Sequence, residues 1–172
     1  RYGSVDLLWL DGAWVRPIGN MPPQYEAWAK KKNFDQDIDM PRIATMARKH
    51  QPGLIVVDRW VSGPFENYLT PEQRVAERPL AVPWESCITA TTSWSYTSGD
   101  QYKSGRELIH MLVDIVAKGG NLLLNIGPGP DGTWQQEAYD RLAEIGAWMK
   151  VNSGAIYDTH PIAPYREGNV RV

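Results

Sequence analysis

The sequence is poor in cysteine and contains no long apolar run. The single cysteine, Cys87, cannot form a disulfide within the chain and excludes a cysteine-rich zinc site. No apolar stretch approaches the roughly 20 residues that a membrane-spanning helix needs. Neither sign of charge is in excess, since 18 Lys and Arg stand against 20 Asp and Glu. The net charge of −2 excludes the strongly basic surface typical of nucleic-acid-binding proteins.

What is present is typical of a globular chain. The 172 residues are enough for one sizeable core. With 42% hydrophobic and 22% charged residues, the composition excludes a disordered chain. The first residue is an arginine with no targeting stretch after it, and residues 169–172 read as the beginning of another strand. We therefore expect a chain that is cut at both ends from a longer protein.

Short apolar runs alternate with amphipathic segments. The runs predict strands at 4–10, 54–57, 121–126 and 155–157, and a strand with the loop after it at 84–96. The segments between them predict helices at 25–32, 39–50, 104–118 and 133–148. Strands that are apolar on both faces indicate a parallel sheet covered by helices. The fold class is therefore α/β, and both a doubly wound sheet and a TIM-type barrel fit it.

Polar residues stand at the C-terminal ends of three predicted strands: Asp11, Asp58 with Arg59, and Asn125. In both folds that edge carries the chemistry. A carboxylate at Asp11 can act as a nucleophile, a general base or a metal ligand, or can simply form a turn with Gly12. Arg59 can clamp a hydroxyl-rich or anionic ligand, or pair with Asp58 or a neighbouring carboxylate.

A stretch rich in proline and glycine at 61–83 predicts a long loop, and long loops in compact domains are often functional. Among the glutamates of this region, Glu85 differs because it follows Trp84 and enters an apolar stretch. A carboxyl group beside an indole suits a general acid. The alternative is an ion pair between Glu85 and an arginine.

The glycine-rich loop 127–132 follows a predicted strand and precedes a helix, where a phosphate could bind. It lacks the Gly-Lys-Ser/Thr signature. Its two prolines donate no N–H, and Asp131 would repel an anion, so a rigid turn is favoured. The three histidines have no metal-ligand spacing and are assigned to the surface: His50, His110 and His160.

Tryptophan is frequent, with eight residues against two phenylalanines. Five stand at predicted strand ends or in the loops after them: Trp9, Trp14, Trp60, Trp84 and Trp94. Indole offers a flat apolar face and one N–H donor, which match the C–H faces and hydroxyl rims of sugars. Core packing explains any one tryptophan, but five at one edge predict a carbohydrate site.

Ordered motifs run along nearly the whole chain. They are Val5-Asp6-Leu7-Leu8-Trp9-Leu10-Asp11-Gly12, Asp58-Arg59-Trp60, Trp84-Glu85-Ser86-Cys87, Ser93-Trp94-Ser95-Tyr96, residues 119–128 with Asp131-Gly132, Ile145-Gly146-Ala147-Trp148, and residues 152–157. Together they resemble the α-L-fucosidases of glycoside hydrolase family 29. The resemblance implies retaining hydrolysis of terminal α-L-fucose by double displacement, with no metal or cofactor.

The resemblance also implies roles for particular residues. Asp11 would be the nucleophile, Trp9 and Arg59 would line the fucose pocket, and Trp94 would face the methyl group of the sugar. The acid/base would lie roughly 5–5.5 Å from the nucleophile, as in retaining enzymes.

Two glutamates are candidates for the acid/base, because the family does not keep it at one position. Segments similar to Trp84-Glu85 carry it in some members, and segments similar to Thr70-Pro71-Glu72-Gln73 carry it in others. We favour Glu85 for its aromatic neighbour, with Glu72 as the alternative.

The implied fold is a partial (β/α)₈ TIM-like barrel with about four or five parallel strands. Residues 1–160 would be the C-terminal half of the catalytic barrel, and 161–172 would begin the connection to a C-terminal β-sandwich. The N-terminal half would be required, so we expect the chain alone to be weak or inactive. The partner would be a fucosylated oligosaccharide or glycoconjugate, with no nucleic acid or membrane involved. The family suggests a secreted, periplasmic or lysosomal location.

Two other functions remain open. The chain can be a non-catalytic carbohydrate-binding or scaffold relative of a glycosidase barrel. It can also be a nucleotide-dependent α/β enzyme, which would bind ATP or NAD at loop 127–132.

Overall fold

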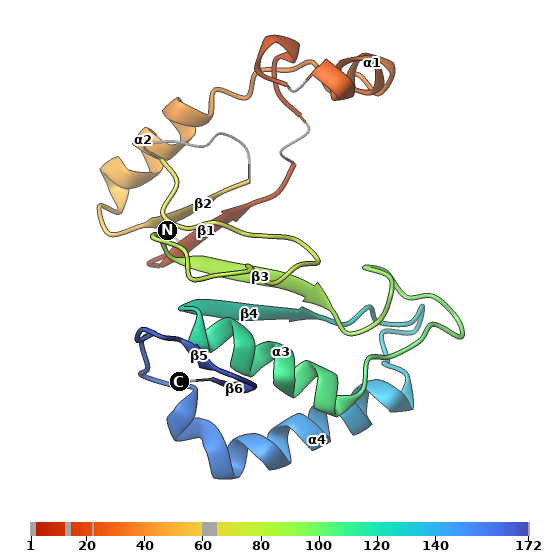
Figure 1. Ribbon diagram of the computed structural model, residues 1–172. Helices are drawn as coiled ribbons and strands as arrows, with labels where there is room; N and C mark the ends of the chain where they lie inside the picture. Colours follow the sequence, from red (N-terminus) through yellow and green to blue (C-terminus); the bar gives the residue numbers. More distant parts are fainter. Residues whose placement is uncertain (1–2, 13–14, 22, 60–64, 172) are drawn as a thin grey trace. The chain divides into compact units, whose positions relative to one another are not determined.

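The computed structural model describes residues 3–12, 15–21, 23–59 and 65–171 (Figure 1). The chain divides into two compact units, residues 1–70 and 71–172. Each unit contains one pair of parallel strands with at least one helix between them in the sequence.

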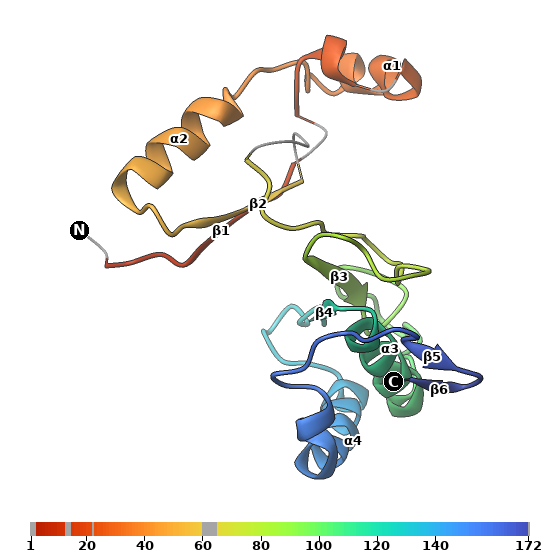
Figure 2. The same cartoon turned by 60° about the vertical axis from the view of Figure 1, so that its left-hand side comes forward.

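The first unit is a β–α–β arrangement. β1 (Leu7–Leu10) is followed by a 3₁₀ turn, by α1 (Pro23–Lys31) and α2 (Met40–His50), and then by β2 (Ile55–Asp58). β1 and β2 pair in parallel with Leu10 opposite Asp58, and Figure 2 shows α2 alongside this pair. Asp11 and Arg59 therefore leave the two strands at the same edge of the sheet.

The core of the first unit lies between α2 and the strands. Its buried members are Met40, Ala44, Leu54 and Val56. As the Asp39-Met40-Pro41 sequence predicts, Asp39 is the N-cap of α2, and its side chain accepts a hydrogen bond from the Arg42 amide at 3.3 Å.

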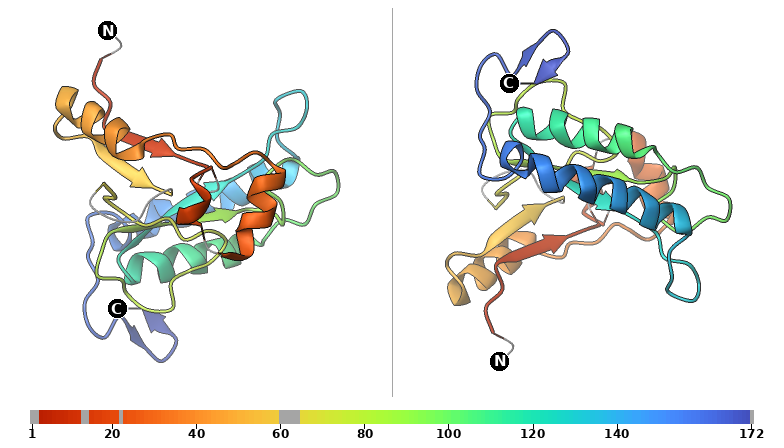
Figure 3. Two further views of the ribbon diagram at one scale, coloured as in Figure 1. Left: turned by 90° about the horizontal axis from the view of Figure 1, so that it is seen from above. Right: turned by 90° about the horizontal axis from the view of Figure 1, so that it is seen from below.

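The second unit begins with a strand–helix–strand arrangement. β3 (Trp84–Thr89), α3 (Gly105–Ala117) and β4 (Gly120–Asn125) are followed by α4 (Gln136–Asn152) and a short hairpin of β5 (Arg166–Glu167) and β6 (Val170–Arg171). β3 and β4 pair in parallel along their whole length. Figure 3 shows α3 and α4 lying side by side.

Trp84 is the largest side chain in the core of the second unit and is 1% exposed. Its indole N–H donates to the Lys118 carbonyl at 3.3 Å. The ring covers Gly120, where a Cβ atom would lie 2.4 Å from it, so the strand pair requires glycine there. The predicted capping box of α3 is present, with reciprocal hydrogen bonds between Ser104 and Glu107.

One predicted strand is wrong, and one predicted helix is confirmed with a later start. The expected strand at 155–157 is instead the end of a 3₁₀ turn (Ser153–Ala155), because the amides of Ile156 and Tyr157 both donate to the Ser153 carbonyl. The expected helix at 133 begins three residues later, at Gln136. Thr133 instead closes the preceding loop by bonding to Asp131.

The α/β fold class is confirmed, with four parallel strands among the described residues. Two of them pair in the first unit, as β1 with β2, and two in the second, as β3 with β4. The described part of the predicted long loop, residues 65–83, contains isolated bridges only, one of which joins Glu72 to Cys87. Closure into a barrel and the boundary at residue 160 stay predictions.

Candidate functional site

The first unit brings three predicted site residues together where β1 and β2 end. The Arg59 Nε atom lies 3.6 Å from the Asp11 Oδ1 atom. The guanidinium carbon of Arg59 also lies 5.2 Å from the centre of the Trp9 ring, which is a cation–π contact. Arg59 is thus held between an indole and a carboxylate. Of the ion pairs that the sequence leaves open for Arg59, the structure shows one with a neighbouring carboxylate, that of Asp11.

The Asp11 side chain is held at one oxygen and accessible to solvent. Its Oδ1 atom accepts a hydrogen bond from the Gly12 amide at 2.9 Å, in a turn where Gly12 has a φ of +105°. The side chain is 53% exposed, whereas that of Arg59 is 14% exposed. An accessible carboxylate beside a fixed guanidinium can attack or bind a polar ligand, so the geometry is compatible with a nucleophile.

The second unit carries the two candidate acid/base residues, Glu85 within β3 and Glu72 in the preceding segment that bridges to Cys87 of β3. Successive side chains of a strand point to opposite faces. Trp84 packs on Gly120, and Glu85, which is opposite Asn121 in the register, projects to the other face. Strand alternation therefore places the Trp84 indole and the Glu85 carboxylate on opposite faces of β3, which weakens this reason for choosing Glu85.

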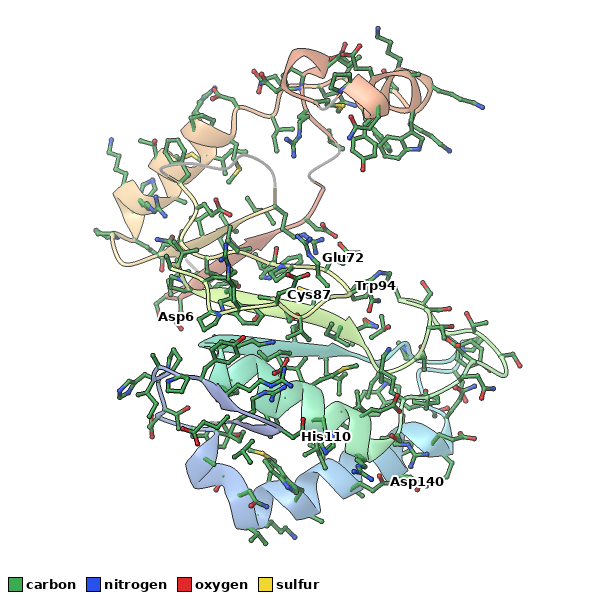
Figure 4. The ribbon with its side chains drawn as sticks, viewed as in Figure 1. Asp6, Glu72, Cys87, Trp94, His110 and Asp140 are labelled. Atoms are coloured by element: carbon green, nitrogen blue, oxygen red, sulfur yellow. The ribbon has the colours of Figure 1, made fainter. Side chains whose placement is uncertain are left out.

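The two glutamates differ in their position along β3. Glu85 is the second residue of the strand, four residues before Thr89 at its C-terminal end. At about 3.3 Å per residue, that is about 13 Å from the edge where Trp94 follows. Glu72 is exposed, and its backbone forms an isolated β-bridge with Cys87 (Figure 4). Cys87 is two residues nearer to the C-terminal end of β3 than Glu85 is.

Trp94 lies in the loop after β3, and its side chain is 40% exposed. Its carbonyl accepts a hydrogen bond from the Asn125 Nδ2 atom at 2.9 Å. The sequence predicts the place of Asn125 at the C-terminal end of a strand but no role for its side chain. The signal that could have revealed one is its position inside the motif of residues 119–128.

The glycine-rich loop 127–132 is a tight turn. The Gly129 amide donates to the Thr133 carbonyl at 2.7 Å, and the Gly132 amide donates to the Gly129 carbonyl at 2.9 Å. Asp131 accepts hydrogen bonds from the amide and hydroxyl of Thr133, which lower the pKa of its carboxyl group. A negative charge fixed inside the loop favours a structural turn over a phosphate site.

Other candidate groups contribute less. Trp84 belongs to the core, while Trp14 and Trp60 lie outside the described residues. His50, His110 and His160 are exposed. Among the described residues, we find no cluster of three or more His, Cys, Asp or Glu side chains that could hold a metal ion. Within the same residues, every helix is too short or too polar to cross a membrane.

Comparisons with known proteins all lead to one family. The sequence model of the α-L-fucosidase family matches residues 1–154. The α-L-fucosidase of Dictyostelium discoideum is 32% identical over 167 residues, which cover 91% of this chain and 32% of that protein. The tissue α-L-fucosidase of Rattus norvegicus is 31% identical over 183 residues, covering all of this chain and 36% of that protein.

Solved structures agree with these sequence matches. The α-L-fucosidase isoenzyme 1 of Paenibacillus thiaminolyticus superposes with a TM-score of 0.78 at 28% identity, over 99% of this chain and 40% of that one. The α-fucosidase of Thermotoga maritima in complex with fucose superposes with a TM-score of 0.60 at 30% identity, over 82% of this chain and 30% of that one. This chain spans about a third of the length of these curated relatives.

Proposed function

Since this chain belongs to the α-L-fucosidase family, we propose that it is part of a retaining glycosidase that hydrolyses terminal α-L-fucose. The substrate would be a fucosylated oligosaccharide or glycoconjugate. The observation that carries the proposal is the grouping of Asp11, Arg59 and Trp9 at the ends of β1 and β2. It supplies an accessible carboxylate, a fixed cation and an aromatic face, which are the groups that a sugar site needs.

Asp11 would act as the nucleophile. Its carboxylate attacks the anomeric carbon of fucose, the glycosidic bond breaks, and a covalent glycosyl-enzyme forms. The acid/base gives its proton to the departing oxygen. The same residue then takes a proton from a water molecule, which attacks the anomeric carbon and releases fucose with Asp11 restored. Arg59 would hold a sugar hydroxyl while its own orientation is kept by the Trp9 ring.

Between the two acid/base candidates, the position along β3 favours Glu72 over Glu85. Parallel α/β folds carry their chemistry at the C-terminal edge of the strands. Glu72 lies beside Cys87 in the C-terminal half of β3, whereas Glu85 lies near the N-terminal end of the strand. We therefore propose Glu72 as the acid/base and keep Glu85 as the alternative.

The nucleophile is tested by Asp11→Ala in the full-length protein that contains this chain. We expect hydrolysis of nitrophenyl α-L-fucoside to fall by about 10³-fold or more, while L-fucose still binds by calorimetry. Asp6→Ala, at an exposed aspartate just before β1, is the matched control and should stay active. Hydrolysis that persists in Asp11→Ala means that Asp11 is not the nucleophile. A wild type that binds fucose without hydrolysing fucosides supports the carbohydrate-binding alternative.

The acid/base is tested by comparing Glu72→Gln with Glu85→Gln on two substrates. A nitrophenolate leaves without protonation, but the alkoxide of a fucosyl disaccharide needs a general acid. We expect Glu72→Gln to lose about 10²- to 10⁴-fold on the disaccharide and much less on the nitrophenyl fucoside. Glu85→Gln should affect both substrates equally. The reverse pattern assigns the role to Glu85.

The rest of the site would come from the N-terminal half of the barrel. We expect the 172 residues alone to release little or no nitrophenol from nitrophenyl α-L-fucoside. The full-length protein should release it efficiently. Efficient release by the isolated 172 residues contradicts this part of the proposal.

A further inference from the structure

The loop that carries Trp94 is attached to the end of β4 at two points. The Ala90 amide donates to the Asn125 carbonyl at 2.9 Å, where the loop leaves β3. The Asn125 side chain then donates from Nδ2 to the Trp94 carbonyl at 2.9 Å. One residue of β4 therefore binds the loop both at its start and at the tryptophan.

Gly127 brings a second segment of backbone against the same loop. A Cβ atom at this position would lie 2.5 Å from the Tyr96 nitrogen and 2.7 Å from the Ser95 carbonyl carbon. Both are backbone atoms, which cannot move aside as a flexible side chain could. Only glycine allows this approach, so the strand end and the loop fit together at Gly127.

The remainder of the loop is braced from within. Lys103 donates from Nζ to the carbonyls of Thr89 and Thr91, at 2.7 and 2.9 Å. Farther along, the Thr92 hydroxyl donates to the Asp100 carboxylate at 2.5 Å, and this bond holds the pKa of Asp100 well below its usual range. These contacts fix the base of the loop. The contact to the Trp94 backbone itself comes from Asn125.

We propose that Asn125 is a positioning residue of the sugar site, which acts through Trp94 with Gly127 as its backbone support. The inference rests on the proposed function and on the role that the family resemblance implies for Trp94, which is to face the methyl group of fucose. The donor is essential to the argument, because a carbonyl can only accept. An aspartate at position 125 would keep the shape of the side chain but set a carboxylate oxygen against the Trp94 carbonyl.

The test uses Asn125→Asp in the full-length protein. A tryptophan that contacts the methyl group, away from the anomeric carbon, binds the ground state and the transition state alike. We therefore expect KM for nitrophenyl α-L-fucoside to rise by about 5- to 10-fold, which is the loss of affinity that one missing hydrogen bond causes. The value of kcat should stay within about 3-fold of the wild type. Gly127→Ala should also raise KM. Gly146→Ala, in α4 with no atom within 4 Å of the added Cβ, should not.

A double-mutant cycle with Trp94→Ala separates positioning from a merely structural role. If Asn125 acts through Trp94, Asn125→Asp should add almost nothing to KM in the Trp94→Ala background. Amide exchange of residues 91–100 should become faster in Asn125→Asp alone. Additive effects on KM, or an unchanged KM in Asn125→Asp, overturn the inference.

Failure of the inference can be told from failure of the proposed function. If Trp94→Ala leaves KM unchanged while Asp11→Ala abolishes hydrolysis, Trp94 lies outside the sugar site; the inference falls and the function stands. If the wild type hydrolyses no fucoside, the function falls. The same cycle is then measured on the Kd for L-fucose, where additivity or an absence of binding overturns the inference as well.

Discussion

The two units of the chain support their strand ends in different ways. In the first unit, β1 is exposed or half-buried along its length, and the residues after β1 and β2 are the charged pair Asp11 and Arg59. In the second unit, β3 is buried except at Glu85, and the contact at the strand ends joins the Trp94 carbonyl to the Asn125 amide. The strand ends of the first unit therefore carry an ion pair, and those of the second unit carry a neutral hydrogen bond beside a buried strand.

The units also differ in how they are held together. In the first, Arg48 donates to the Asn67 side chain at 2.6 Å and to the Phe65 carbonyl at 3.1 Å, both of which are neutral. In the second, Lys118 is 7% exposed and donates to Asp114 at 2.6 Å. A buried cation is costly unless it is paired, so Lys118 of the second unit depends on an ionic contact, whereas Arg48 of the first unit is bound by neutral groups.

The largest expected effect separates a core tryptophan from a site tryptophan. Trp84→Ala should lower the free energy of unfolding by about 3–5 kcal/mol, because it empties the space over Gly120 and removes the bond to Lys118. Trp94→Ala, at an exposed ring, should cost less than about 1 kcal/mol. Urea unfolding of the two variants measures the difference. Equal losses would show that Trp94 is part of the core.

The next effect is a dependence on pH in the second unit. Burial raises the pKa of Asp114, but hydrogen bonds from Lys118 and Arg171 outweigh it, so the pKa is lowered overall. The resulting stability is present above the ordinary aspartate pKa of about 4 and is lost as the pH falls through the lowered value.

Asp114→Asn should therefore destabilise the second unit at neutral pH, by about 1–3 kcal/mol. In this variant, the free energy of unfolding of the second unit should also fall less steeply as the pH is lowered into the acid range. Amide exchange of α3 at pH 7 and pH 3 measures both changes, with Asp140→Asn, at an exposed position on α4, as the control. A fall in Asp114→Asn as steep as in the wild type would falsify the assignment.

The smallest effect compares the two helix caps. Ser104 and Asp39 cap α3 and α2, but only Ser104 has the reciprocal bond from the residue at N3. Replacing Ser104 by alanine should cost about 1 kcal/mol, and replacing Asp39, whose bond is longer at 3.3 Å, about half as much. Amide exchange in the first turn of each helix measures the two losses. If the Asp39 replacement destabilises α2 more than the Ser104 replacement destabilises α3, the expected order of the two caps is wrong.

Local patterns predicted the elements whose partners are close in the sequence. The caps at Asp39 and Ser104 were predictable because a side chain bonds to an amide three residues away. The strand predicted at residues 155–157 is wrong, because a short apolar run does not indicate whether a partner strand is present. A place at a strand end groups Trp84 with the tryptophans of the predicted sugar site, but its ring packs in the core. Glu85 is favoured in the sequence for its neighbour Trp84, although neighbours on a strand face opposite ways.

The sequence by itself determined the fold class, the family and the residues that follow each strand, because these depend on apolar periodicity and on motifs that are continuous in the chain. Only the tertiary structure decided which of those residues meet. Asp11 and Arg59 are 48 positions apart, and Trp94 and Asn125 are 31 apart; each pair is joined by the parallel register of two strands. Strand register is set by packing between distant segments, and no local pattern specifies it.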